Sequence, residues 1–290
     1  MLYSMTGYGK SSIKLGDKSY IIEIKSLNSK SLDLNFKAVA ELRGKEIDIR
    51  KLISSQLIRG KVDLFFQEEK SNGMSGNLNF NQIENYYHQL LKFSNEKNIP
   101  LGDIIPAILR LQDINKGELA ELNEDDIVSL NKGVEESLKN VIQFRKDEGT
   151  QLEKDLIARI NAIQQLKSEM APHEMSRMEK LKEKLKQDIM NHVQEGLVDK
   201  NRFEEELIYY LEKMDINEEK VRLDTHCLYF METLQEDVME KGKKLGFIGQ
   251  EIGREINTIG SKANDSNMQK IVVQMKEELE NIKEQVLNVL

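Results

Sequence analysis

GKKLGFIGQEIGREINTIGSK, residues 242–262, is the stretch whose pattern organises the rest of the chain. Its isoleucines recur at steps of four, four and three, which places them on one face of a helix. They are Ile248, Ile252, Ile256 and Ile259. Residues four apart are neighbours on a helix, so two polar stripes lie beside this face. One holds Gln250, Arg254, Asn257 and Ser261, and the other holds Glu251, Glu255, Thr258 and Lys262. The pattern predicts a helix with one buried face and two carboxylates one turn apart.

Glycines take the remaining side of this predicted helix, at Gly246, Gly249, Gly253 and Gly260. A glycine inside a helix costs about 1 kcal/mol relative to alanine. Four of them on one side therefore predict that another backbone or a ligand approaches closely.

Long helices of high charge are predicted from Asp125 onward. Apolar residues recur at helical spacing from Leu152 to Met170 and again from Leu181 to Leu197, and Pro172 is predicted to end the first of these helices. Narrow apolar stripes of this kind are typical of helices packed as hairpins or coiled coils. Asn217 is predicted to cap the next helix. We interpret residues 121–215 as a long helical hairpin region and 216–290 as a C-terminal helical domain that carries the site.

The N-terminal part has the alternation of strands. Residues 20–24, 32–36 and 62–66 have strand length and apolar character, with a helix predicted over 41–58 and a turn at Gly16. Glycine, serine and asparagine cluster at 71–77, which predicts a loop. Phe80 is predicted to lie in a short strand, followed by a helix over 82–95 and a compact helical segment around Ile108. The fold class is therefore α+β: a small N-terminal sheet-and-helix domain over 1–75, with 76–120 as its candidate extension, and then mostly helix.

Composition limits the classes of function. The chain has 290 residues, 32% of them charged, and a net charge of −8, so any RNA site has to be a local basic patch. Aromatic residues make up 6% and tryptophan is absent, which argues against an aromatic platform for single strands. The N-terminus lacks the plan of a signal peptide, and one cysteine cannot form an internal disulfide, so we expect a cytoplasmic protein without a membrane span.

Glu251 and Glu255 are the first candidates for chemistry, because carboxylates one turn apart can share Mg²⁺ or Mn²⁺. The ordinary alternative is that Glu251 pairs with Arg254 and Glu255 with Lys262 as structural charge pairs. His226 is the candidate for proton transfer, since its unperturbed pKa is near 6.5, although a lone helical histidine is more often structural. His88, His173 and His192 are interpreted as structural, and Cys227 as a small buried hydrophobe.

Basic side chains form two candidate RNA-binding groups. Lys243, Lys244, Arg254 and Lys262 lie at the start of the 242–262 helix or on it. Lys25, Lys30, Arg59 and Lys61 belong to the N-terminal sheet, where neighbouring strands could bring them onto one face. Phosphates attract such groups. The alternative for the first group is a solvated helix end.

Several motifs resemble those of the bacterial YicC/YloC family of endoribonucleases. The first is QE-x-x-RE-x-NT-x-x-SK, formed by Gln250, Glu251, Arg254, Glu255, Asn257, Thr258, Ser261 and Lys262. Further segments resemble the same family: SMTGYG at 4–9, the 23–30 segment, RGKV at 59–62, RL-x-x-H at 222–226, and a tail that includes Lys276, Glu280 and Glu284. The chain departs from the family pattern at Lys243 and Lys283, which replace arginines, and at Gly246, which replaces an acid.

The resemblance implies a metal-dependent endoribonuclease that acts in RNA turnover and assembles as a homo-hexamer with a channel or clamp for RNA. It supports His226, Glu251 and Glu255 as catalytic residues and implies Mg²⁺ or Mn²⁺ as cofactor. Glu251, Glu255 and Glu280 are the expected metal ligands, since Gly246 cannot serve. The alternative is a non-catalytic RNA-binding or adaptor oligomer, in which the motif at 250–262 packs subunits together.

Overall fold

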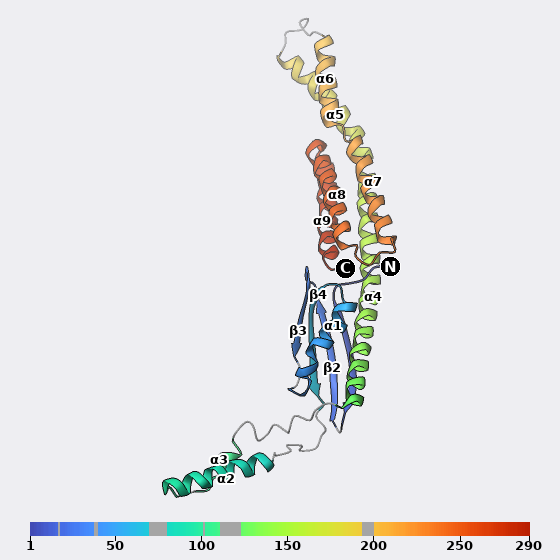
Figure 1. Cartoon of the computed structure of the whole chain (residues 1–290). Coiled ribbons are helices and arrows are strands. Elements are labelled where there is room, and N and C mark those ends of the chain that lie inside the picture. Colours follow the sequence, from blue (N-terminus) through green and yellow to red (C-terminus); the bar gives the residue numbers. More distant parts are fainter. Residues whose placement is uncertain (17, 38–39, 70–79, 101, 111–122, 193–199) are drawn as a thin grey trace. The chain divides into compact units, whose positions relative to one another are not determined.

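The computed structural model describes residues 1–16, 18–37, 40–69, 80–100, 102–110, 123–192 and 200–290 (Figure 1). These residues form two compact units. The sheet unit comprises Tyr8–Ser26 and Ser31–Val141, and the helical unit comprises Met1–Gly7, Leu27–Lys30 and Ile142–Leu290. One long helix, α4 (Glu124–Glu169), contributes to both. The α+β class predicted from the sequence is confirmed.

A four-stranded sheet forms the centre of the sheet unit, in the order β1-β2-β4-β3. Its strands are β1 (Gly7–Leu15), β2 (Lys18–Leu27), β3 (Leu32–Lys37) and β4 (Gly60–Glu68). β3 and β4 are parallel, with Leu32 opposite Gly60. A parallel pair needs a crossover, which the 3-10 helix η1 (Ala40–Lys45) and α1 (Glu46–Gln56) provide. The strands predicted at 20–24, 32–36 and 62–66 and the helix predicted at 41–58 are thereby confirmed.

One face of the sheet is covered by the first part of α4. The hydroxyls of Ser11 on β1 and Ser137 on α4 lie 2.7 Å apart, and both are buried. A Cβ atom at Gly133 of α4 would lie 2.2 Å from the Cγ2 of Ile13. Only glycine therefore allows the helix to approach β1 this closely.

Two further helices follow the sheet, α2 (Phe80–Lys97) and α3 (Ile105–Ile108). The helix predicted at 82–95 is confirmed by α2. The short strand predicted at Phe80 is wrong, because this residue starts α2 and has a 73% exposed side chain with no strand neighbour. The loop predicted at 71–77 lies outside the described residues.

The helical unit contains the second part of α4 and five more helices. They are α5 (Ala171–His192), α6 (Lys200–Met214), α7 (Asn217–Gln235), α8 (Gly242–Ala263) and α9 (Ser266–Val286). Pro172 does not end α4, which stops at Glu169; it lies in the first turn of α5, where its missing N–H breaks no helical bond. The N-cap predicted at Asn217 is wrong by one residue, because Ile216 is the N-cap and Asn217 is the first residue of α7; the Asn217 N–H donates to the carboxylate of Asp215 at 3.0 Å.

α8 lies at the centre of the helical core and packs on both α7 and α9 (Figure 1). Its isoleucine stripe is buried, as predicted, against residues such as Leu223 and Phe230 of α7 and Met275 of α9. Close approach to α9 occurs at Gly260, where a Cβ atom would lie 2.9 Å from Val272 Cγ1. Gly249 has open space at the same position, so the four glycines do not share one role.

The two ends of the chain pair with each other within the helical unit. Ser4 forms an isolated antiparallel bridge with Val289, and the Met5 N–H donates to the carbonyl of Asn288 over 2.8 Å. The guanidinium of Arg145 on α4 donates to the Met5 carbonyl at 3.1 Å. The first six residues are therefore an integral part of the C-terminal core.

Across the described residues, none of the helices has both the length and the apolar character needed to cross a bilayer.

Candidate functional site

Two ion pairs fix how α7 and α8 lie against each other. The ammonium of Lys262 is 2.7 Å from Oε1 of Glu219, and Lys244 pairs with Glu236 near the opposite end. The residue numbers of each pair add to 480 or 481, so the two helices run antiparallel with a constant register. The space between them is a seam, hereafter the α7–α8 seam, with one ion pair at each end.

His226 and Glu255 lie at the same height along this seam. His226 is seven residues after Glu219, and Glu255 is seven residues before Lys262. Residues seven apart share a face of a helix, so both side chains are on the faces that the ion pair joins. His226 is half-buried, while Glu255 is only 8% exposed. The antiparallel register therefore places a histidine and a carboxylate that are distant in sequence at the same level along the seam.

Glu255 differs from the other carboxylates of α8. Within the described part of the chain it makes neither a hydrogen bond nor an ion pair. The structural pairing with Lys262 does not form, because Lys262 binds Glu219 instead. A buried carboxylate without a cation is costly unless something compensates its charge. Glu255 is therefore a mostly covered acidic residue of this helix whose carboxylate has no partner among the described residues.

Glu251 forms the structural charge pair with Arg254 that was the alternative to metal binding. It is half-buried and lies 2.7 Å from a guanidinium nitrogen of Arg254, whose side chain is 72% exposed. The hydroxyls beside it bind their own helix: Thr258 donates to the Arg254 carbonyl, and Ser261 to that of Thr258. Gln250 and Asn257 are exposed. The motif thus has one face directed to solvent, while the carboxylate of Glu255 lies in the α7–α8 seam.

The structure does not assemble the three expected metal ligands into one group. Glu280 lies on α9, is exposed, and pairs with Lys283 at 2.8 Å. No three acidic, histidine or cysteine side chains among the described residues are placed to share an ion. Glu251 and Glu255, one turn apart on α8, remain as the two-carboxylate part of the predicted set.

Some basic side chains of this region are exposed, and others are held in ion pairs. Lys243 is exposed at the start of α8. Lys244 pairs with Glu236 and lies 4.8 Å from the Tyr229 ring centroid, and the hydrogen bond that its ammonium donates to Glu236 raises its pKa. Lys262 is held by Glu219. Tyr229 was not predicted, although its spacing of three from His226 places it on the same side of α7.

Lys241 shows that one nearby cation is structural. Its side chain is buried and donates to the carbonyls of Leu234 and Met1, at 2.7 and 3.3 Å. Cys227, next to His226, is also buried, as predicted, and burial raises the pKa of its thiol to about 12. Neither side chain is available to an RNA phosphate or as a nucleophile.

The second basic group is divided by the fold. Lys25 on β2 and Lys61 on β4 both project from the exposed face of the sheet. Lys30 lies in the connection between β2 and β3, and Arg59 precedes β4 and is half-buried. Neighbouring strands bring together only the two residues that lie within strands.

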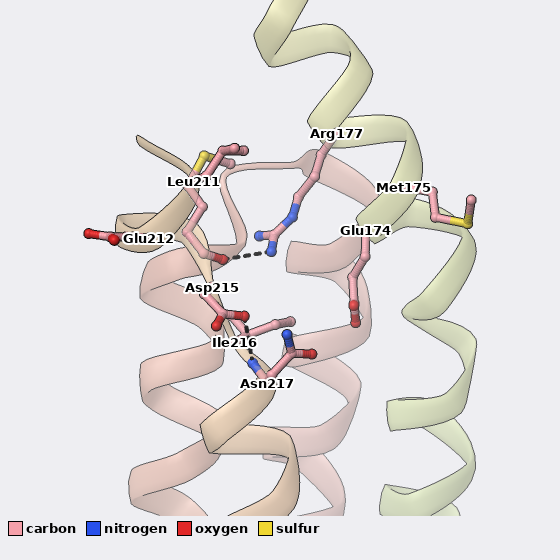
Figure 2. A pocket seen from close by; sticks show the side chains of 9 residues that line it. Glu174, Met175, Arg177, Leu211, Glu212, Asp215, Ile216 and Asn217 are labelled. Carbon is pink, nitrogen blue, oxygen red and sulfur yellow. Dashed lines mark hydrogen bonds between the residues drawn. The ribbon is translucent and has the colours of Figure 1, made fainter. Parts of the chain in front are cut away.

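A cavity of about 440 Å³ lies among α5, α6 and the start of α7 (Figure 2). Its lining includes Arg177 and the acids Glu174, Glu212 and Asp215. The buried Arg177 guanidinium donates to the carbonyls of Met214, Lys262 and Ala263 at 2.7–3.0 Å. Burial lowers its pKa, and nearby acids oppose this shift. Because its two terminal nitrogens donate to carbonyls at the C-terminal ends of α6 and α8 and acids line the same cavity, the cavity does not suit a phosphate.

Comparison with known proteins agrees with the motifs. The family model for the N-terminal region of YicC-like endoribonucleases matches residues 2–154, and the model for their C-terminal part matches residues 170–290. A protein of Clostridioides difficile named "Probable endoribonuclease YicC" is 33% identical over the full length of both chains. A protein of the same name from Haemophilus influenzae is 26% identical over 99% of each chain. The chain therefore belongs to the YicC-like endoribonuclease family.

Proposed function

We propose that this protein is an endoribonuclease that cleaves RNA phosphodiester bonds with the help of a divalent metal ion. Family membership and the names of the two relatives support the reaction class. The observation that carries the assignment to a site is the pairing in height of His226 with the buried, unpartnered Glu255 in the α7–α8 seam. A proton-transfer group and a carboxylate in need of a cation are the parts that such a reaction requires.

The donors in the seam suit a hard cation. Glu255 offers carboxylate oxygens without a competing partner in the described chain, and Glu251 adds two more one turn away. Oxygen ligands favour Mg²⁺ or Mn²⁺, which keep several waters and take further oxygens from substrate phosphates. Such an ion neutralises charge on the phosphoryl oxygens and acidifies bound water. Glu280 joins the set only if Lys283 releases it.

The protein's own side chains then have separate tasks. The imidazole of His226 takes or gives a proton. Arg254 and Lys243 are exposed and bind phosphates on either side of the scissile bond, with the fork of Arg254 leaving Glu251 to do so. Lys244 adds positive potential at the end of the seam, and Lys262 holds Glu219 in place.

We further propose that the protein acts in RNA turnover as a homo-oligomer, a hexamer by its resemblance to the family, whose copies surround an RNA channel. A chain of net charge −8 repels RNA as a whole. Symmetric assembly multiplies one basic patch into a ring, which would concentrate positive potential where the substrate passes.

A non-catalytic RNA-binding or adaptor oligomer is the second candidate. The observation in its favour is that Arg254, Lys244 and Glu280 are each satisfied by a neighbouring charge, as expected of a packing surface. Such a protein would bind RNA without cutting it.

The test compares Glu255→Gln with Glu277→Gln, which changes an exposed carboxylate of α9. We expect Glu255→Gln to cleave a structured RNA orders of magnitude more slowly while binding it as tightly or more tightly, because one negative charge is lost. Glu277→Gln should behave as the wild type. Near wild-type cleavage by a correctly assembled Glu255→Gln protein would show that this carboxylate is structural.

The metal requirement is tested with excess EDTA. We expect cleavage to stop and to return when Mg²⁺ or Mn²⁺ is added. Full cleavage in EDTA would instead favour metal-free attack by the RNA's own 2′-hydroxyl with His226 as base, and His226→Gln would then abolish activity. The absence of cleavage under every condition, together with intact RNA binding, would identify the adaptor.

A further inference from the structure

The face of the sheet opposite α4 is open to solvent within the described residues. Alternate residues of β1, β2 and β4 are buried, whereas their neighbours are exposed or half-buried. We call this surface the open sheet face. It includes Tyr8, Lys10 and Lys14 on β1, Glu23 and Lys25 on β2, Lys61, Asp63 and Phe65 on β4, and Asp33, Asn35 and Lys37 on β3. Its polar and aromatic side chains have no role in covering the core.

Four of these residues form a row across the sheet, one from each strand. The ammonium of Lys25 is 6.0 Å from the ring centroid of Tyr8 and 5.4 Å from that of Phe65. On the other side of Phe65, the ammonium of Lys37 is 5.2 Å from the same centroid, and Lys37 is opposite Phe65 in the strand register. With the strand order β1-β2-β4-β3, the row alternates aromatic, cationic, aromatic and cationic side chains.

The charge of this face differs from that of the chain. Lys10, Lys14, Lys25, Lys37 and Lys61 stand against the acids Glu23, Asp33 and Asp63, so the face carries excess positive charge on a protein of net charge −8. The pair of Glu23 and Lys25, 3.3 Å apart, cancels one charge of each sign and leaves the excess unchanged, and Asp63 accepts from the neutral amide of Asn35 at 2.9 Å. A polyanion complements this surface, whereas an apolar protein partner would bury lysines without a counter-charge.

We propose that the open sheet face binds a single-stranded segment of the RNA substrate, with two bases stacked on Tyr8 and Phe65 and with Lys25 and Lys37 bound to the phosphates between them. The proposal rests on the proposed function, since it concerns the same RNA. Rings can reach the faces of bases only where the bases are unpaired, because a duplex hides them in its stack. The flexible lysine stems allow each ammonium to leave the ring and follow a phosphate. Tyr8 is 39% exposed and so is accessible to a base.

The experiment measures binding of a short, labelled 2′-O-methyl oligouridylate to the full chain by fluorescence anisotropy over a series of salt concentrations. Tyr8→Leu and Phe65→Leu remove a ring and keep an apolar side chain. Lys25→Gln and Lys37→Gln remove a charge and keep length. Matched controls are Phe144→Leu and Lys139→Gln, exposed positions on α4. Circular dichroism and light scattering establish that each variant is folded and assembled.

We expect each ring variant to bind the single strand about 5- to 150-fold more weakly, with an unchanged salt slope, because a stacked base is worth about 1–3 kcal/mol. Each lysine variant should reduce the log–log salt slope by about 0.7. A duplex of the same length should bind all ring variants as it binds the wild type. The two control variants should bind the single strand with wild-type affinity and salt slope.

Two results would overturn the proposal. One is wild-type affinity of both ring variants for the single strand, which would leave the face as a purely electrostatic surface. The other is loss of the oligomer in the ring variants, which would make the face a subunit contact. Failure of the proposed function is distinguishable, because a wild type that cuts no RNA can still show single-strand binding that depends on Tyr8 and Phe65.

Discussion

The ammonium of Lys262 in the last turn of α8 lies 2.7 Å from Oε1 of Glu219 in the first turn of α7. The second oxygen of Glu219 is buried and has no hydrogen-bond partner. Lys262 is therefore the one cation seen to compensate this carboxylate in the described chain, and the pair helps to set the register of α7 against α8.

Removal of one partner of this pair should cost more than removal of both. Lys262→Met leaves the Glu219 carboxylate buried and uncompensated, so we expect the free energy of unfolding to fall by about 1–3 kcal/mol. The double variant with Glu219→Met should recover most of the loss. Urea unfolding followed by circular dichroism measures both, with Lys270→Met on the exposed side of α9 as control. Equal losses in Lys262→Met and the control would show that the pair contributes nothing.

Two glycines of α8 should respond oppositely to alanine. At Gly260 the new methyl would meet Val272 Cγ1 at 2.9 Å, so Gly260→Ala should destabilise by about 1–3 kcal/mol despite its better helix propensity. At Gly249 the space is open, and Gly249→Ala should stabilise by up to about 1 kcal/mol. Thermal unfolding compares the pair directly. A loss of stability at Gly249 would show that another copy of the chain covers this position.

Arg177 should be one of the least replaceable side chains of the helical unit. Arg177→Ala leaves three helix-end carbonyls without their charged donor, and we expect a loss of about 3 kcal/mol or more. Arg177→Lys keeps the charge but not the planar fork, and should lose an intermediate amount. Met175→Ala, an exposed neighbour, serves as control in the same denaturation experiment. Wild-type stability of Arg177→Lys would mean that charge alone matters.

The cap of α9 should make stability depend on acid. The Asp265 carboxylate accepts from the Met268 and Asn267 N–H groups at 3.0 and 2.9 Å, and these bonds lower its pKa. Its stabilising effect is full above the unfolded pKa of about 3.9 and is lost as pH falls through the lower folded value. The difference in melting temperature between wild type and Asp265→Asn should therefore shrink as pH drops below about 4. A difference that stays constant down to pH 2 would refute this account.

The assembly should be visible in solution. Light scattering on the purified protein at micromolar concentration is expected to give the mass of a hexamer of 33.5 kDa chains. A monomer would count against the RNA channel and against the ring of basic patches.

The elements that the sequence predicted are those in which buried side chains recur with the period of a helix or a strand. The isoleucine stripe of α8 and the alternation at residues 20–24 and 62–66 report directly which face meets the core. Which charged side chains pair with each other leaves no such periodic signal in the sequence. Lys262 could have bound Glu255 on its own helix, but binds Glu219, which is 43 residues away. The choice depends on the register of two helices, which only the packed fold determines.

The same dependence on the packed fold explains why the sequence did not predict the arrangement of the candidate sites. Composition argued against an aromatic platform, yet Tyr8 and Phe65 come from separate strands and meet Lys25 and Lys37 only because the strand order is β1-β2-β4-β3. His226 and Glu255 are likewise brought level by the antiparallel α7–α8 hairpin. The start of α7 was predicted to within one residue, since Ile216 rather than Asn217 is the N-cap and the Asn217 N–H donates to Asp215.

The bridge between Ser4 and Val289 has a consequence for synthesis on the ribosome. The sheet unit is complete once residue 141 has emerged, but the partner of Ser4 is made last. Asn288, beside Val289, lies 284 positions after Ser4, so at about 5–20 residues per second it is made about 14–57 s later. During that time the first six residues lack the segment with which Ser4 pairs. The nascent chain therefore cannot close its C-terminal core until translation has passed residue 289.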